Sequence, residues 1–327
     1  MRVLITGGTG FTGSHAVRRY LARGHSVRIL DNHKGVFFDE LSGAGAEIQL
    51  GSVADREAVR KAVENVELVH HIAAAFREIN VPKSVYKGVN VDGTRFVAEE
   101  ALRAGARRVV YCSTEGVHGH VVDPPANEEA PIAPEDYYQQ TKWEGEIAFR
   151  EVMGRGLDGV ILRPTGIYGP GDPARFLMLF RMVKRGHFFI VGDGRAQYHP
   201  LYIDNLCDAF ELAAEKAEAR GETFLIADDR SLSWNELIPL VAKTLGIDVK
   251  IHYLPLGPVW LGAALCEAAC WPFGIRPPLF RRRAEMFSHM RAFDISKARR
   301  MLGYEPKVPL EEGLARTCAW YRAHGYL

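Results

Sequence analysis

Near the start of the chain, the sequence reads Thr6-Gly7-Gly8-Thr9-Gly10-Phe11-Thr12-Gly13, directly after the apolar run Val3-Leu4-Ile5. Its glycines Gly7, Gly10 and Gly13 recur every three residues, and a helix-competent run follows. A strand, a glycine-rich turn and a helix in this order can hold the pyrophosphate of a dinucleotide at the helix N-terminus. The first glycine allows the tight turn, the second lets backbone N–H groups reach the phosphates, and the third lets the helix pack closely on the strand.

An acidic residue at the end of the next expected strand strengthens this interpretation. Asp31 follows the strand-like run 26–30 and lies 21 residues after Gly10. A carboxylate at this place accepts hydrogen bonds from the adenosine ribose. It also repels the 2′-phosphate of NADP, which favours NAD, although His33 and Lys34 could offset part of that repulsion. A turn residue at a strand end is the alternative role for Asp31.

The length and composition limit what kind of protein this is. The 327 residues suffice for one large α/β domain with a smaller lobe, or for two domains. A net charge of +1 argues against nucleic acid as a partner. The five cysteines have no metal-ligand spacing and no Cys-x-x-Cys motif, so we expect no metal site and a reduced, cytoplasmic protein. Because the first strand occupies the N-terminus, we expect no signal peptide.

Strand-like and helical runs alternate through the first half of the chain. The strand-like runs are 46–50, 68–72, 108–112 and 159–162, and the helical runs are 55–64, 93–104 and 137–154. This alternation, with strands too apolar to face water, predicts an α/β fold with a doubly wound parallel sheet of the Rossmann type. We expect residues 1–165 to form the dinucleotide-binding domain.

The pattern loosens after Arg163. Strand-like runs at 188–191, 223–226 and 250–253 are interspersed with helical runs at 174–185, 203–217 and 233–245. We expect residues 166–327 to form mainly a smaller C-terminal α/β substrate-binding lobe. It should lie above the carboxyl ends of the strands, where ligands bind in such folds, and return one or two strands to the main sheet.

Tyr138 and Lys142 form a Tyr-x-x-x-Lys pair within an expected helix, and this spacing puts both side chains on one face. Free tyrosine has a pKa of about 10 and is a poor base near neutrality. A neighbouring ammonium favours the phenolate, and the positive ring of an oxidised nicotinamide would add to that effect. Tyr138 could then accept the proton of a substrate hydroxyl while a hydride leaves the same carbon. A surface Tyr/Lys pair is the alternative, which the glycine-rich turn disfavours.

We expect a hydroxyl side chain at the end of strand 108–112 to complete this site. Thr114 is the preferred candidate and Ser113 is the reserve. Either hydroxyl could hold the substrate oxygen against Tyr138. Because serine and threonine also cap helices and turns, capping is the alternative role.

Taken together, these motifs resemble the extended short-chain dehydrogenase/reductase family, also called the NAD-dependent epimerase/dehydratase family. The resemblance runs nearly end to end and includes these further segments: Asp31-Asn32, His71-Ile72-Ala73-Ala74, Asn90-Val91-Asp92-Gly93-Thr94, Arg163-Pro164, Tyr168-Gly169-Pro170-Gly171, Tyr202-Ile203-Asp204 and Leu302-Gly303-Tyr304-Glu305-Pro306. It implies an NAD-dependent enzyme with a small-molecule substrate. It also implies a homodimer, which in this family often forms through the helix that begins near Tyr138.

The resemblance further implies which residues bind the cofactor. Ala73 and Ala74 should lie against it, and Lys142 should bind the nicotinamide ribose. The other candidates are Gly7, Gly10, Phe11, Thr12, Gly13, Asp31, Asn32, Ser52, Val53, Asn90, Arg163 and Pro164. One departure is Gly51-Ser52-Val53, where the family usually has Gly-Asp-Leu, so the usual carboxylate contact to adenine is missing or replaced.

Four local features separate this chain from the sugar-nucleotide members of the family. Those members usually have asparagine where this chain has Gly166 and arginine where it has Tyr198. Their Pro-x-Arg-Pro-Gly segment is absent, and the dehydratase pattern Ser-Thr-Asp-Glu is replaced by Ser113-Thr114-Glu115-Gly116. The segment 162–172 and the C-terminal layout instead resemble the branch of 3β-hydroxysteroid dehydrogenases and sterol-4-carboxylate 3-dehydrogenases.

Candidate substrate-binding residues follow from the same resemblance. They are Gly166, Tyr168, Arg195 and Arg291. Arg291 stands where sugar-nucleotide members keep a phosphate-binding arginine, and Arg195 could supply another charge. These two arginines therefore argue against a purely hydrophobic substrate.

A long apolar stretch, 254–280, lies in the second half. It could form a lid over a hydrophobic substrate, a surface helix at a membrane, or a core helix of the smaller lobe. In the second case Arg276 and Arg281-Arg282-Arg283 would meet anionic headgroups, giving a peripheral membrane contact through residues 254–283.

These features predict an NAD-dependent oxidoreductase that oxidises a secondary hydroxyl on a steroid- or terpenoid-like alcohol by hydride transfer to the nicotinamide. The alternative is a sugar-nucleotide epimerase of the UDP-hexose 4-epimerase type, with tightly bound NAD and a 4-keto intermediate. A non-catalytic NAD-binding protein on the same fold is a third option. The set of Thr114, Tyr138 and Lys142 argues against it.

Overall fold

Strand β1 (Arg2–Thr6) lies inside the main sheet, with a strand on either side, and is buried on both faces. Val3 and Ile5 point into one hydrophobic core and Leu4 into another, because successive side chains of a strand alternate between its faces. The strand pairs in parallel with neighbours on both sides, where Ile5 is level with Ile29 and His70. The computed structural model describes residues 1–76, 81–173, 175–270 and 287–327.

The main sheet has seven parallel strands in the order β11-β6-β5-β4-β1-β2-β3. The other six strands are β2 (Ser26–Asp31), β3 (Glu47–Leu50), β4 (Leu68–His71), β5 (Arg108–Cys112), β6 (Gly159–Pro164) and β11 (Thr223–Ile226). The strand order reverses between β1 and β4, the point at which ligands bind in doubly wound sheets. The fold is therefore the expected Rossmann type, and β11 joins the sheet from the second half of the chain.

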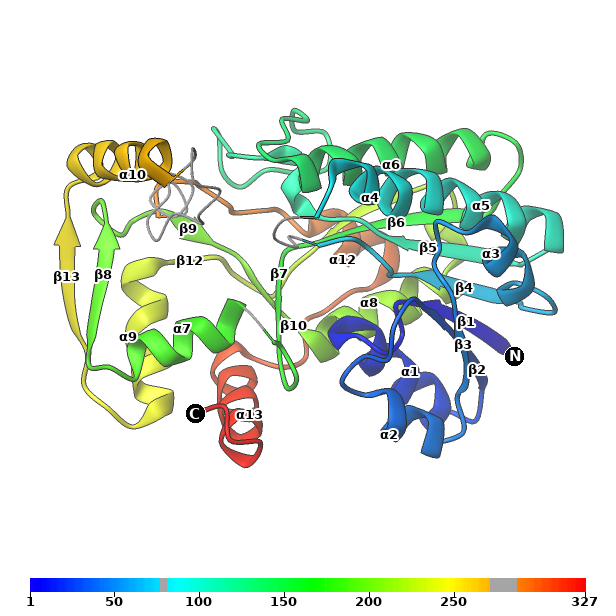
Figure 1. Ribbon diagram of the computed structural model, residues 1–327, viewed down its shortest axis with the longest axis horizontal. Coiled ribbons are helices and arrows are strands. Elements are labelled where there is room, and N and C mark those ends of the chain that lie inside the picture. The colour runs from blue at the N-terminus through cyan, green and yellow to red at the C-terminus, as the bar shows by residue number, and fades with distance from the viewer. Residues whose placement is uncertain (77–80, 174, 271–286) are drawn as a thin grey trace.

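Helices cover both faces of this sheet (Figure 1). On one face, α1 (Phe11–Ala22) packs against α8 (Ile203–Glu215) and against α2 (Phe38–Gly43). On the other face lie α3 (Arg56–Ala62), α4 (Lys83–Lys87), α5 (Gly93–Ala104) and α6 (Tyr137–Met153), with a π-helical turn at Gly88–Asp92. Short 3₁₀ turns occupy Glu115–His118 and Ala217–Ala219.

The second part of the molecule contains three two-stranded sheets and lies beside the main sheet in Figure 1. The pairs are β7 (Gly166–Tyr168) with β10 (Pro200–Tyr202), β8 (His187–Val191) with β13 (Lys250–Leu254), and β9 (Gln197–Tyr198) with β12 (Leu232–Ser233). Its helices are α7 (Arg175–Val183), α9 (Trp234–Leu245), α10 (Leu256–Cys270) and α13 (Leu310–Ala323), whereas α12 (Ser296–Leu302) packs against β11 of the main sheet and against α8.

Most element predictions agree with the structure to within two or three residues. The helix expected at 137–154 is α6, and the helix expected at 203–217 is α8, which ends at Glu215. The sequence analysis did not predict the short helices α2 and α4, because each spans at most six residues and shows no full hydrophobic repeat. The apolar stretch 254–280 contains α10, whereas Arg276 and Arg281-Arg282-Arg283 lie outside the described residues.

The close packing of the glycine-rich turn gives a direct prediction. A Cβ atom on Gly13 would lie 2.2 Å from the Gly7 carbonyl oxygen, so Gly13→Ala forces the turn and α1 apart. We expect a loss of about 1 to 3 kcal/mol in unfolding free energy, and loss of stabilisation by NAD. The measurement is thermal unfolding with and without NAD. Gly43→Ala, in a helix with open space around the new Cβ, is the matched control. A Gly13→Ala protein with wild-type stability and a full NAD response would contradict this.

Candidate active site

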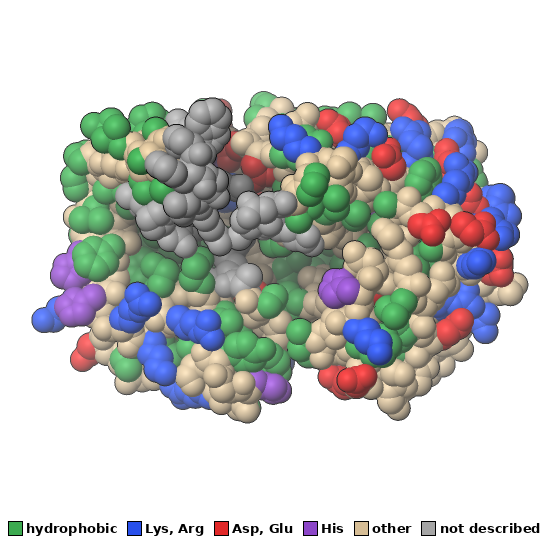
Figure 2. Space-filling view, viewed as in Figure 1, with side chains coloured by type: hydrophobic (Ala, Val, Ile, Leu, Met, Phe, Trp, Pro, Cys, Tyr) green, Lys and Arg blue, Asp and Glu red, His purple; other side chains and the backbone are tan. Residues whose placement is uncertain are grey.

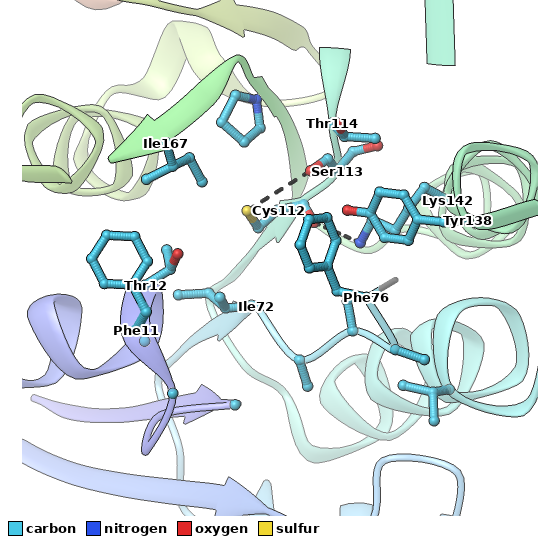
Figure 3. Close-up of a pocket in the computed structure, with 18 of the residues that line it drawn as sticks. Phe11, Thr12, Ile72, Phe76, Cys112, Ser113, Thr114, Tyr138, Lys142 and Ile167 are labelled. Atoms are coloured by element: carbon cyan, nitrogen blue, oxygen red, sulfur yellow. Dashed lines mark hydrogen bonds between the residues drawn. The ribbon is translucent and has the colours of Figure 1, made fainter. Parts of the chain in front are cut away.

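A cavity of about 460 Å³ opens at the carboxyl ends of the sheet strands. One end is formed by the glycine-rich turn and the ends of β1 and β2, and the other by α6 and the segment after β5 (Figure 3). The sequence-predicted residues that line it are Gly7, Gly10, Phe11, Thr12, Gly13, Asp31, Asn32, Ser52, Val53, Ala73, Ala74, Ser113, Thr114, Tyr138, Lys142, Pro164, Gly166 and Arg291. The structure thus brings these residues from eight separate segments of the sequence into one pocket.

The glycine-rich turn has the geometry of a phosphate cradle. Gly7 has a positive φ of 70°, and a Cβ atom there would lie 2.9 Å from the Cα of Ala73. Gly10 occupies the N-cap position of α1, and glycine has no side chain with which to cap the first N–H groups of the helix. Those N–H groups and the positive end of the helix dipole suit an anionic pyrophosphate.

Asp31 joins the glycine-rich turn to the end of β2. Its Oδ2 accepts hydrogen bonds from the Thr9 backbone N–H, at 3.0 Å, and from the Thr9 hydroxyl, at 2.7 Å. Its Oδ1 lies 3.7 Å from Nδ1 of His33 on the pocket side. The carboxylate is therefore held in place before any ribose binds. The sequence analysis did not assign this role to Thr9, since the contact spans 22 residues.

A buried chain of hydrogen bonds fixes the segment that should face the cofactor. The Thr6 hydroxyl oxygen accepts from the backbone N–H groups of Ile72 and Ala73, so its own hydrogen goes to Nδ1 of His71 at 2.8 Å. His71 then carries its hydrogen on Nε2, which donates to the Thr94 hydroxyl at 3.0 Å. Burial lowers the pKa of His71 to about 3, so the ring stays neutral.

Asn90 lies behind this segment, outside the pocket lining. Its side-chain amide accepts from the N–H of Ala75 and donates to the carbonyl of Ala75 and to the Thr141 hydroxyl, at 2.9 to 3.1 Å. Asn90 therefore makes structural contacts and does not line the pocket. The amide ties the 73–75 segment to α6, because a fully buried amide needs these partners.

The Tyr138 and Lys142 pair lies on the face of α6 that borders the pocket. The helix begins after Asp136, whose carboxylate accepts from the N–H of Gln139 at 2.7 Å. Figure 3 shows the Tyr138 hydroxyl directed toward the segment after β5, with the Lys142 amine beside it. The rings of Tyr138 and Phe76 meet edge to face, with centroids 4.9 Å apart, so Phe76 forms a wall beside the expected base.

Lys142 is completely buried, and its environment holds it in one position. Its Nζ donates to the carbonyl of Cys112 at 2.7 Å and lies 4.4 Å above the ring of Tyr111. Burial lowers the pKa of this ammonium to about 8, so it still carries its charge at neutral pH. A fixed positive charge one helical turn from Tyr138 is the arrangement that stabilises a phenolate.

The two hydroxyl candidates after β5 both line the pocket, with different partners. Ser113 donates its hydrogen to Oε1 of Glu146, 2.6 Å away and fully buried. Thr114 donates to Glu115 at 2.8 Å and accepts from the N–H of Gly116 at 3.1 Å. Both hydroxyls donate to a carboxylate, so these contacts do not choose between them, and Thr114 stays the preferred candidate for the substrate oxygen.

Arg163 makes structural contacts, as Asn90 does. It is buried outside the pocket lining, where it donates to both oxygens of Glu146 at 2.9 and 2.7 Å and to Nε2 of His118 at 3.0 Å. The pKa of Glu146 is raised by burial, but Arg163 outweighs that effect and the net pKa is lowered, which keeps the pair ionised. Arg163 therefore supports the pocket floor, and its neighbour Pro164 lines it.

The candidate substrate residues divide into two groups. Gly166 and Arg291 line the pocket. Tyr168 is fully buried outside it, stacked on Phe176 at 4.5 Å, and Arg195 is 86% exposed with Asp193 as its ion-pair partner. The structure therefore does not bring Tyr168 and Arg195 into the pocket with the other candidates. Tyr168 belongs to the core of the second part, and Arg195 faces solvent because it follows the Gly192–Gly194 turn.

Gly166 is explained by Tyr198. A Cβ atom at position 166 would lie 1.9 Å from the Tyr198 hydroxyl oxygen, so the tyrosine fills the space that a side chain there would need. Tyr198 also packs against Trp234 and Phe176, with ring centroids 5.6 and 6.2 Å away. The two departures from the sugar-nucleotide pattern at positions 166 and 198 thus form one matched pair beneath the pocket.

Comparisons with known proteins agree with this geometry. A model of the NAD dependent epimerase/dehydratase family matches residues 3–227. A 3-beta-hydroxysteroid dehydrogenase from Mycolicibacterium neoaurum is 30% identical, over 98% of this chain and 91% of the relative. A 2-alkyl-3-oxoalkanoate reductase from Stenotrophomonas maltophilia is 32% identical, over 98% and 99%. The crystal structure of a Thermotoga maritima UDP-glucose 4-epimerase with UDP-glucose has a TM-score of 0.79 at 27% identity, over 99% of both chains.

The fold and the pocket define an NAD-dependent enzyme of the Rossmann class, in which a tyrosine and a lysine from one helix face the cofactor site. The chain belongs to the NAD-dependent epimerase/dehydratase family, the extended short-chain dehydrogenases/reductases, and its relatives include 3β-hydroxysteroid dehydrogenases. The residues present fit NAD, because the glycine-rich turn leaves room for the pyrophosphate and Asp31 stands at the expected ribose position.

The buried lysine gives a prediction on stability. The pKa of Lys142 is about 8 in the folded protein and 10.5 ordinarily, so the unfolded chain binds more protons between these values and stability rises with pH across this window. Lys142→Met should therefore reduce the increase in unfolding free energy between pH 7 and pH 10 by about 2 to 3 kcal/mol. Denaturant unfolding at pH 7 and pH 10 measures it, with the exposed Lys184→Met as control. An unchanged pH response in Lys142→Met would show that the folded protein does not depress this pKa.

Proposed function

We propose that the protein oxidises a secondary hydroxyl of a hydrophobic, steroid- or terpenoid-like alcohol. The observation that carries this proposal is the packing of Tyr198 against Gly166, which leaves no room there for the asparagine side chain that sugar-nucleotide members usually have. Apolar residues also line the pocket around Tyr138, among them Ile72, Phe76, Val85, Val89 and Ile167. Relatives named for the oxidation or reduction of steroids and alkyl chains support the same class of substrate.

In this proposal the chain's own residues handle the proton and the geometry. NAD, when bound, supplies the acceptor for the hydride. Tyr138 takes the proton of the substrate hydroxyl, and the Lys142 ammonium stabilises the phenolate before that transfer. Thr114 holds the substrate oxygen from the opposite side. Phe76 and Ile72 keep water away from the reacting carbon.

A sugar-nucleotide epimerase is the second candidate. One observation favours it, since Arg291 lines the pocket at the position where sugar-nucleotide members bind phosphate. The two functions differ in net chemistry. A dehydrogenase releases NADH, whereas an epimerase returns the hydride to the other face of a 4-keto intermediate and accumulates none.

We also propose that residues 1–165 hold the cofactor and that residues 166–327 mainly hold the substrate.

We further propose that the protein is cytoplasmic and forms a homodimer through α6. Ile147 on α6 supports such an interface. Its apolar side chain is 42% exposed, whereas other residues of the helix are buried against the rest of the protein. Light scattering in solution tests this. A monomer at micromolar concentration would refute it.

Peripheral membrane contact through residues 254–283 is a further proposal. Hydrophobic side chains gather over α10, β8 and β13 (Figure 2), including Phe189, Tyr253, Leu256, Trp260, Leu261 and Leu265. Across the described ranges, no helix is both long and apolar enough to cross a membrane. Co-sedimentation with anionic vesicles tests the contact, and equal sedimentation of the wild type and Leu261→Glu would refute it.

The proposed role of Tyr138 as the base is tested by removing its hydroxyl oxygen. Tyr138→Phe should lower turnover by about 100-fold or more, because a positioned acid–base group contributes on this scale. The measurement is NADH formation with a panel of sterol and terpenoid secondary alcohols. Tyr137→Phe is the matched control, since Tyr137 precedes it on α6, packs on Tyr86 and lies outside the pocket lining. Near-normal turnover in Tyr138→Phe would remove this tyrosine from the mechanism.

A further inference from the structure

Arg291 is held at the substrate end of the pocket by two carboxylates. Its guanidinium lies 3.7 Å from Glu115 and 3.5 Å from Glu135, and its side chain is only 19% exposed. The backbone N–H of Arg291 donates to the carbonyl of Gln197 at 3.0 Å, which fixes where the side chain begins. The arginine is therefore positioned and partly enclosed, and its charge is shared between two acids.

Glu115 cannot easily turn away from the arginine. One of its oxygens accepts the Thr114 hydroxyl at 2.8 Å, and the other faces Arg291. The side chain is 8% exposed and lines the pocket. Its carboxylate thus stands between the hydroxyl that should hold the substrate and the only arginine that lines the pocket among the described residues.

Glu135 closes the other side of Arg291. Nδ1 of His289 lies 3.1 Å from its carboxylate, and the ring of His120 stacks near His289, with centroids 5.3 Å apart. Burial raises the pKa of Glu135, but His289, Arg291 and His120 outweigh it, and the net pKa lies below the ordinary value. The carboxylate is therefore ionised at neutral pH and above.

Acidic side chains outnumber the guanidinium at this end of the pocket. Two carboxylates, those of Glu115 and Glu135, face the one guanidinium of Arg291. The other cation nearby, Lys142, is buried against the carbonyl of Cys112 and the ring of Tyr111. A diphosphate entering this end would meet an arginine that already faces two carboxylates, and these two like charges would repel it.

We propose that Glu115 and Glu135 are specificity-determining residues: they neutralise Arg291, so that the pocket rejects a nucleoside diphosphate and admits an uncharged alcohol. This inference rests on the proposed function and deepens it by naming the substrate class. The scaffold retains the arginine that could bind phosphate, and the two acids keep it occupied. The pocket then discriminates against a nucleoside diphosphate because the two carboxylates repel it, and not only because an attractive contact to phosphate is lost.

The test is calorimetric titration of UDP into the NAD-saturated protein at pH 8. We expect the wild type to bind UDP with a Kd above about 1 mM. Glu115→Gln/Glu135→Gln should bind at least tenfold more tightly, and adding Arg291→Gln should abolish the gain. Glu129→Gln, an exposed glutamate in the loop that also contains Glu135, is the matched control and should leave binding unchanged.

Two results would overturn the inference. One is wild-type UDP binding as tight as that of the double variant. The other is a double variant that has the melting temperature of the wild type and yet binds UDP no more tightly. The alcohol panel is run separately on the wild type. If no alcohol yields NADH, the proposed function fails, while the UDP titrations still decide whether the two acids block the arginine.

Discussion

The active site depends on how α6 is attached to the ends of β5 and β6. Lys142 donates to the Cys112 carbonyl, and one turn further along the helix Glu146 binds both Ser113 and Arg163. Burying an ammonium, a carboxylate and a guanidinium is costly unless each is paired, and here each has a partner within 3 Å. The pairing allows one orientation of the helix. That orientation places Tyr138 over the pocket, opposite the cofactor cradle.

Local spacing in the sequence was enough to predict the parts of the site that come from single turns or single helix faces. The glycine-rich turn, Asp31, Tyr138 and Lys142 all lie where the spacing placed them. Local spacing was not enough where distant partners decide where a residue lies. Asn90 binds Ala75 and α6, Arg163 binds Glu146, and Tyr168 is enclosed by the core, and none of these contacts leaves a periodic signal. Glu146 and Thr9 were missed for the same reason.

Substrate choice in this fold is a matter of what surrounds a shared catalytic pair. The proposed roles of Tyr138 and Lys142 would serve oxidation and epimerisation equally well, because both reactions begin with removal of a proton and a hydride. What differs is the far wall of the pocket. Here Tyr198 packs beneath Gly166 and leaves no room for a side chain at that position, and two glutamates flank Arg291. The proposal of an uncharged hydrophobic substrate rests on these two features.

The most direct test of the central claim follows the hydride itself. A secondary alcohol that is deuterated at the carbinol carbon is incubated with the protein and excess NAD, and the cofactor is analysed by mass spectrometry. The account predicts one deuterium in the released NADH for each ketone formed. Deuterium that stays in an epimerised product, with no labelled NADH in solution, would contradict it and establish an epimerase.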